Sequence, residues 1–175
     1  NTSLLFDQVE GFLEHTVEAG TVPDVITWHE LSHPDQIRGS VERYRGWEAE
    51  IFAGTDHEGT ELPININEYA FNYHTSVPGQ MVQWMSAIEE SKVDAMIAFW
   101  NINGNLSDSA VQANRANGQW WLYNAYGNMT GHTVDVTPPH PGENYTLQGM
   151  ATLDEERALA RTLLGGSDGA ARVQF

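Results

Sequence analysis

Residues 61–71, which read Glu-Leu-Pro-Ile-Asn-Ile-Asn-Glu-Tyr-Ala-Phe, carry the strongest structural signal in this chain. A proline followed by isoleucines at alternate positions is typical of a β-strand. Successive side chains of a strand point to opposite faces, so we expect Ile64, Ile66 and Glu68 to share one face. Two apolar residues followed by an acid predict a strand that lines a barrel and brings Glu68 to its mouth, where carboxylates at strand ends perform chemistry. The alternative is that Glu68 simply reaches solvent where the strand ends.

The composition predicts one folded domain, or one and a fraction, with a strongly acidic surface. Of the 175 residues, 41% are hydrophobic, which is ample for a core, and the lack of cysteine removes disulfides and thiolate metal sites. A formal net charge of −16 repels nucleic acid and anionic membranes but suits neutral, hydroxylated ligands such as sugars. No apolar run reaches the roughly 20 residues that a membrane span needs. We therefore expect neither a nucleic-acid nor a membrane partner, and the oligomeric state stays open.

Helix-like and strand-like patterns alternate along the first 130 residues. The predicted helices span residues 5–17, 35–51, 81–88 and 120–129, and the predicted strands span 25–29, 61–71 and 95–100. We expect Gly20 to end the first helix and Asp35 to be the N-cap of the second. A polar loop over residues 101–117 follows the third strand. This order is typical of parallel βα units.

After Gly131 the pattern changes to short alternating runs separated by turn residues, which is typical of antiparallel strands. These runs span residues 133–137, 145–153, 158–164 and 170–175. We therefore predict a partial α/β barrel at 1–130 and β-strands of an appendage at 131–175. Three parallel strands cannot close a barrel, so the chain either borrows strands from a partner or is the last part of a larger protein. We favour the second interpretation, because the chain begins at Asn1 as though cut from something longer.

The segment His29-Glu30-Leu31-Ser32-His33 matches the zinc-peptidase pattern His-Glu-x-x-His. That mechanism needs the two histidines one helical turn apart, so that both face the same metal. Here the motif follows a strand pattern, and Pro34 disfavours a helix that runs through His33. A zinc metallopeptidase is therefore only the third functional hypothesis, and we expect no metal site and no cofactor.

Three predicted strand ends carry a family resemblance: Thr27-Trp28-His29-Glu30, Asn67-Glu68-Tyr69 and Ala98-Phe99-Trp100-Asn101. Together with Gly-Gln-Trp-Trp-Leu-Tyr-Asn-Ala-Tyr-Gly at residues 118–127, they resemble the last third of clan A glycoside hydrolases, most closely family 39 and its relatives. The resemblance covers most of the chain. It implies the C-terminal portion of a (β/α)8 TIM barrel, about three βα units, followed by antiparallel strands of an appended β-sandwich. It also implies an extracellular or periplasmic protein.

The resemblance assigns roles to individual residues at the strand ends. Glu68 would be the nucleophile of a retaining glycosidase, which forms a covalent glycosyl–enzyme intermediate. His29 would hydrogen-bond Glu68 or a sugar hydroxyl, unless it is a buried core histidine. Trp100 would form a platform under the sugar at the cleaved subsite, with core packing as its alternative role. The further substrate-binding candidates are Tyr69, Asn101 and Asn103.

One family feature has no counterpart in this chain. The acid/base glutamate normally ends the fourth barrel strand, and that strand would lie upstream of Asn1. Glu30 is a candidate substitute, although alternation points it out of the barrel if His29 points in. The leading hypothesis is the C-terminal part of a retaining glycoside hydrolase that cleaves O-glycosidic bonds in oligo- or polysaccharides and is inactive as an isolated chain. The alternative is a noncatalytic carbohydrate-binding or structural protein.

Overall fold

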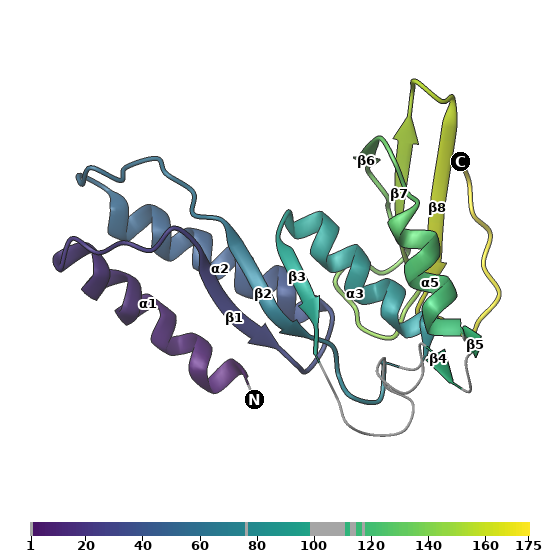
Figure 1. Cartoon of the computed structure of the whole chain (residues 1–175), viewed down its shortest axis with the longest axis horizontal. Helices are drawn as coiled ribbons and strands as arrows, with labels where there is room; N and C mark the ends of the chain where they lie inside the picture. The colour runs from purple at the N-terminus through teal and green to yellow at the C-terminus, as the bar shows by residue number, and fades with distance from the viewer. Residues whose placement is uncertain (1, 76, 99–110, 113–114, 117) are drawn as a thin grey trace.

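The computed structural model describes residues 2–75, 77–98, 111–112, 115–116 and 118–175. The elements, in chain order, are α1 (Thr2–Glu18), β1 (Ile26–Glu30), α2 (Asp35–Phe52), β2 (Ile64–Tyr69), α3 (Pro78–Ser91), β3 (Asp94–Ile97), β4 (Val111–Gln112), β5 (Arg115–Ala116), α5 (Gly118–Gly127), β6 (His132–Val134), β7 (Gln148–Asp154) and β8 (Leu159–Gly165) (Figure 1). None of the described helices has the length and apolarity needed to cross a bilayer.

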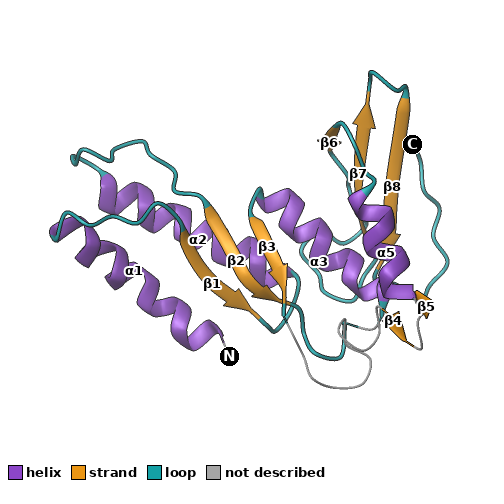
Figure 2. Ribbon diagram, viewed as in Figure 1, coloured by secondary structure: helices purple, strands orange, loops and turns teal. Residues whose placement is uncertain are grey.

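The strands β1, β2 and β3 form a parallel sheet in that order, which confirms the predicted alternation of helix and strand. α1 packs on α2 and α2 packs on α3 (Figure 2), and all three helices bury apolar side chains in one core with this sheet. Ile26, Trp28 and Ile66 belong to that core. Thr27 and Met96, which alternate with such core positions, are exposed. One face of the parallel sheet is therefore covered by helices, and the other face, as far as the described residues go, carries exposed side chains and is called the open face.

The pairing between β1 and β2 shifts register near the end of both strands. Trp28 pairs with Ile66 just before the shift. His29 pairs with Glu68 just after it, which leaves Asn67 as an extra residue of β2. Such a β-bulge reverses the alternation of faces beyond it. The expectation that Glu68 shares a face with the isoleucines of β2 is therefore wrong, because those isoleucines are buried in the helix-side core and Glu68 lies beside His29.

The strands β6, β7 and β8 form an antiparallel sheet, which confirms the strand type expected after Gly131. β7 and β8 pack against α3, where the Ser86 hydroxyl donates a hydrogen bond of 2.8 Å to the Gly149 carbonyl. Two expectations are wrong: residues 170–175 form no strand, and the segment expected to be a plain loop contains the pair β4 and β5. The boundary between residues 130 and 131 stays a prediction.

The start of α2 also differs from the expectation. Pro34 occupies the N-cap position, and Asp35 is the first helical residue. Pro34 makes no side-chain capping bond, and the backbone N–H of Asp35 donates to the side-chain oxygen of Asn144, at 3.0 Å. The first N–H groups of a helix lack partners within the helix, so a distant side chain can satisfy one of them. This contact fastens the segment before β7 to the end of the parallel sheet where β1 leads into α2.

Gly165 of β8 lies against the backbone of α3. A Cβ atom at Gly165 would lie 2.4 Å from the carbonyl oxygen of Gly79 in α3. We predict that Gly165→Ala lowers the free energy of unfolding by about 1–3 kcal/mol, since overpacking at a backbone contact forces the two elements apart. Urea unfolding of both proteins measures the difference.

Gly46→Ala is the matched control, because nothing lies within 4 Å of a Cβ built at this position on α2. A glycine-to-alanine change inside a helix should stabilise the protein by up to about 1 kcal/mol. Equal stability of the two alanine variants would contradict the close packing of α3 on β8.

Candidate active site

His29 and Glu68 meet at the carboxyl ends of two neighbouring parallel strands. Nδ1 of His29 lies 3.4 Å from Oε2 of Glu68, and the two side chains are 42% and 43% exposed. Both lie on the face of the sheet that is free of the helix-side core. The exposed carboxylate is accessible to a ligand, and the imidazole beside it has a ring nitrogen that can donate a hydrogen bond to it.

The backbone on both sides of Glu68 departs from regular strand geometry. The bulge residue Asn67 precedes it. Ala70, two residues later, is fully buried and has a φ of 98°, although it is not glycine. Its N–H donates to the Glu30 carbonyl at 3.2 Å. Backbone outliers of this kind persist only where the surrounding structure holds them, and they cluster at functional sites.

The structure does not bring Tyr69 to the face that carries Glu68. Tyr69 is buried on the helix side, where its ring packs 6.0 Å from that of Trp84. Its hydroxyl forms a hydrogen bond of 2.6 Å with the Tyr123 hydroxyl, and burial raises the pKa of Tyr69 to about 12. A sugar contact for Tyr69 stays a prediction that this placement does not favour. Tyr69 instead anchors the end of β2 to α5.

Three further candidates lie outside the described residues: Trp100, Asn101 and Asn103. Their assigned roles stay predictions.

Glu30 lies on the helix side of the sheet, as its alternation with His29 predicts. It is fully buried, and the Trp28 indole N–H donates to its carboxylate at 2.8 Å. Burial raises the pKa of Glu30 to about 6, while the nearby Ser40 and Trp28 side chains and the Arg43 charge act in the opposite direction. The structure therefore leaves Glu30 and Glu68 on different faces of the sheet.

The His-Glu-x-x-His segment does not form the helix that zinc peptidases need. β1 ends at Glu30, and the residues up to His33 are irregular. Nδ1 of His33 lies 3.1 Å from the Tyr145 hydroxyl, whereas His29 faces Glu68. Across the described residues, no group of three or more potential metal ligands comes together. The described part of the chain thus offers no support for the zinc hypothesis.

An aromatic group beside the strand ends was not anticipated from the sequence. Phe71 follows β2, His33 follows β1, and Tyr145 precedes β7. The ring of His33 packs against those of Phe71 and Tyr145, with centroids 6.5 and 5.8 Å away. His33 and Tyr145 are 112 residues apart in the chain, so no local pattern could have joined them.

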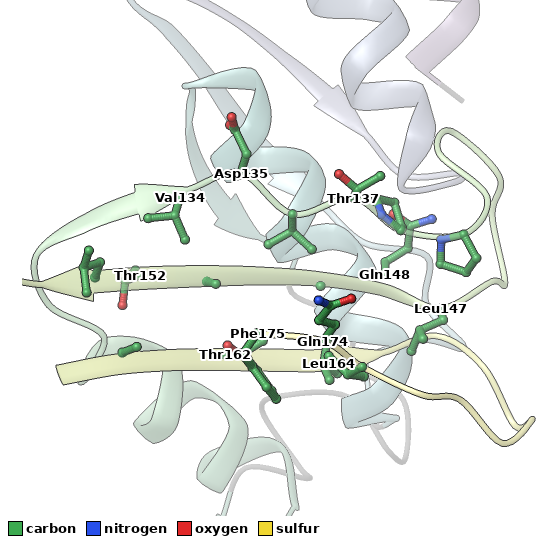
Figure 3. A pocket seen from close by; sticks show the side chains of 18 of the residues that line it. Val134, Asp135, Thr137, Leu147, Gln148, Thr152, Thr162, Leu164, Gln174 and Phe175 are labelled. Carbon is green, nitrogen blue, oxygen red and sulfur yellow. The ribbon is translucent and has the colours of Figure 1, made fainter.

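The antiparallel sheet carries a hollow of about 630 Å³. Its walls come from β6, β7, β8 and the C-terminal tail, and they include Leu147, Leu164 and Phe175 (Figure 3). Neither His29 nor Glu68 lines it. The hollow is thus separate from the candidate active site.

Two curated relatives match most of this chain. A 3-O-α-D-galactosyl-α-L-arabinofuranosidase of Bifidobacterium longum subsp. longum is 41% identical over 170 residues, which is 95% of this chain and 14% of the relative. A 3-O-β-L-arabinopyranosyl-α-L-arabinofuranosidase of Bifidobacterium pseudocatenulatum is 38% identical over 162 residues, which is 91% of this chain and 16% of the relative. The chain therefore spans about one-seventh of the length of these relatives.

One solved structure is similar in fold to this chain. N2152 from Neocallimastix frontalis superimposes with a TM-score of 0.74 and 29% identity, over 87% of this chain and 37% of that one. No family model matches the chain. The chain is thus similar to a small part of two arabinofuranosidases and to part of the fold of N2152.

The buried Glu30 carboxyl predicts a pH dependence of stability. Its pKa is raised from 4.5 to about 6 in the folded protein, so ionising Glu30 costs more there than in the unfolded chain. The protonated Glu30 carboxyl therefore contributes to the unfolding free energy. That contribution, measured as the difference from Glu30→Gln, is fully present below the unfolded pKa and is lost as pH rises through the folded pKa. We expect the difference in unfolding free energy between the two proteins to fall by about 2 kcal/mol between about pH 4 and pH 7.

Urea unfolding across that pH range measures the effect. Glu156→Gln at an exposed turn is the control, and its unfolding free energy should match that of the unsubstituted chain. A pH-independent difference for Glu30→Gln would contradict the buried carboxyl.

Proposed function

We propose that this chain is the C-terminal part of a retaining glycoside hydrolase in which Glu68 is the nucleophile. The observation that carries the proposal is the pair of His29 and Glu68, 3.4 Å apart at the carboxyl ends of neighbouring parallel strands. The names of the two relatives, both arabinofuranosidases, support the same class of reaction. The activity belongs to the whole protein that contains this chain, which we call the parent.

We assign the three parallel βα units to the wall of a TIM barrel. Helices cover one face of the sheet, and the open face would be the barrel interior. In such barrels the active site lies at the carboxyl ends of the strands, which is where His29 and Glu68 meet. The bulge at Asn67 supports the assignment, because it places the carboxylate on the face that would be the interior. The antiparallel sheet would then belong to the appended β-sandwich.

Glu68 would act as follows. A carboxylate oxygen of Glu68 attacks the anomeric carbon while a carboxylic acid elsewhere in the parent protonates the departing oxygen. The resulting glycosyl ester is hydrolysed by water, which the second carboxyl group deprotonates, and the anomeric configuration is retained. A hydrogen bond from His29 would hold the Glu68 carboxylate in position for the attack. Glu30 is not the second group in this scheme, because it is buried on the helix side.

We propose an α-L-arabinofuranoside that carries a further sugar on O3 as the substrate. Both relatives are named for arabinofuranosides with a sugar at that position, although the two sugars differ. The net charge of −16 is compatible with a neutral carbohydrate, which is not repelled. An extracellular or periplasmic location is also proposed, since the family resemblance implies it.

Replacement of Glu68 tests the nucleophile. In the parent, we expect Glu68→Gln to lower kcat by about 10⁴-fold or more, because the covalent step loses its attacking group. Adding azide to Glu68→Ala should restore cleavage of an aryl α-L-arabinofuranoside and release an arabinosyl azide of inverted configuration. A 2-fluoro-arabinofuranosyl inhibitor should label Glu68, as read by peptide mass spectrometry.

Asp94→Asn is the matched control, since Asp94 begins β3 at the opposite end of the sheet. Side chains at that end of a barrel serve stability, so kcat should stay within about 3-fold of the parent. Hydrolysis that survives Glu68→Gln, or a label on another residue, would reject the assignment. A parent that binds arabinofuranosyl oligosaccharides but never cleaves them would establish the noncatalytic alternative.

His29 offers a second test of the same site. Removing the donor in His29→Ala should lower kcat by about 10²-fold, in the range measured when one preorganised hydrogen bond to a reacting group is lost. The measurement is the steady-state rate on the aryl arabinofuranoside over a range of pH. If the rate and the pH profile both stay unchanged, His29 does not assist Glu68.

A further inference from the structure

Five aromatic side chains from three separate segments meet beside the carboxyl ends of β1 and β2. This aromatic cluster consists of His33, Phe71, Tyr73, His74 and Tyr145. Neighbouring rings lie 5.3–5.8 Å apart, centroid to centroid, for the pairs Phe71–His74, Phe71–Tyr73, His74–Tyr145 and His33–Tyr145. Aromatic rings at these separations support one another's position.

The aromatic cluster is held firmly on its inner side and is open on its outer side. His74 is 5% exposed, and its Nδ1 accepts a hydrogen bond of 3.1 Å from the Trp84 indole of α3. Burial, together with the nearby His33, lowers the pKa of His74, which keeps this ring neutral and able to accept that bond. Tyr73 is 72% exposed and Tyr145 is 50% exposed. Two tyrosine rings are therefore presented to solvent on a fixed base.

Tyr145 is held in a backbone conformation that its side chain disfavours. Its φ is 64°, in the left-handed region where glycine and asparagine are the usual residues. Its N–H donates to the Gln83 side chain of α3 at 2.7 Å, and its hydroxyl lies 3.1 Å from Nδ1 of His33. The preceding residue, Asn144, is fastened to the start of α2. Glycine would adopt this backbone conformation with less strain than tyrosine. The presence of tyrosine therefore indicates that its ring has a function at this position.

Phe71 connects the aromatic cluster to the end of β2 that carries Glu68. Phe71 is three residues beyond Glu68, so their Cα atoms are at most about 11 Å apart. His33 is likewise four residues beyond His29. A sugar bound at Glu68 and the sugar next to it together span a distance of this order. The edge of the cluster at Phe71 is thus within reach of the second ring of a bound oligosaccharide.

We propose that the aromatic cluster is a binding subsite for a neutral sugar that adjoins the unit reacting at Glu68. The flat faces of Tyr73 and Tyr145 would pack on the apolar face of that sugar, and the Tyr145 hydroxyl and His33 would hydrogen-bond its hydroxyl groups. The inference rests on the proposed function, because it takes Glu68 to mark the reacting unit. The adjoining sugar is either the one on O3 of the arabinofuranose or the first one on the leaving side.

Tyr145→Gly in the parent separates binding from folding. It removes the ring and also relieves the left-handed strain, which offsets the lost ring packing, so the melting temperature should change little. The affinity for the sugar should fall about 10-fold, as expected for loss of one aromatic stacking contact. A residue with only a structural role would show the opposite result, with a lower melting temperature and unchanged affinity. Tyr145→Phe, which keeps the ring, should retain most of the affinity.

Three substrates locate the adjoining sugar. These are an aryl α-L-arabinofuranoside, the same aryl glycoside with α-D-galactose on O3, and an oligosaccharide in which the leaving group is a sugar. Loss of kcat/KM in Tyr145→Gly on the second substrate but not on the first places the subsite on the O3 side. Loss on the third alone places it on the leaving side. An equal loss on all three substrates, or no loss on any, would overturn the proposal.

Direct binding distinguishes failure of this inference from failure of the proposed function. Binding is measured by calorimetric titration in the Glu68→Gln parent, which should not cleave the ligand. The ligands are α-D-galactosyl-(1→3)-L-arabinose and the oligosaccharide, and the tyrosine changes are added to this variant. Tyr145→Gly and Tyr73→Ala should each weaken binding to at least one of these ligands. Phe12→Ala, which removes an exposed aromatic ring from α1, is the control and should change neither binding nor rate. Unchanged affinity in both tyrosine variants would refute the subsite even if Glu68 is the nucleophile.

Discussion

The extra residue in β2, Asn67, determines which side of the parallel sheet carries the Glu68 carboxylate. Without it, strict alternation would place Glu68 with Ile64 and Ile66, which lie in the helix-side core. An unpaired carboxylate in such a core is costly, as the raised pKa of buried Glu30 illustrates. The bulge instead sets Glu68 beside His29 on the open face. The exposure of the carboxylate, its partner and its proposed chemistry all depend on this one shift of register.

α3 connects the parallel sheet to the segments that surround the strand ends. Its Trp84 lies in the core beneath the sheet and also donates to His74 in the loop after β2. Its Gln83 accepts the N–H of Tyr145, and its Ser86 bonds to β7. A single helix thus fixes two of the three segments that form the aromatic cluster. α3 therefore joins the antiparallel sheet to the segments around the strand ends.

A helix or strand was predictable from the sequence wherever the spacing of its apolar residues stayed regular from one end of the element to the other. Apolar spacing located α2 and the strands β1 and β2 because each buries a single face, whereas α3 is buried all round over residues 81–88. The bulge at Asn67 was not predictable, since a register shift is defined only by pairing with β1. Tyr145 was missed for a related reason, because its partners His33 and Gln83 lie far away in the chain. The pairing of His29 with Glu68 was expected from the family resemblance, although the face that Glu68 was assigned to was wrong.

The two glutamates at the ends of β1 and β2 show why a pKa alone does not identify a catalytic acid. Glu30 has a pKa of about 6, a value suited to a general acid near neutral pH. A proton donor must also lie within hydrogen-bond reach of the departing oxygen, and Glu30 instead accepts the Trp28 indole N–H on the helix side. A retaining pair needs its carboxyl groups roughly 5–5.5 Å apart in the same cavity. In the proposed mechanism, the second carboxyl group therefore lies on another strand of the parent, whose end would face the same cavity as Glu68.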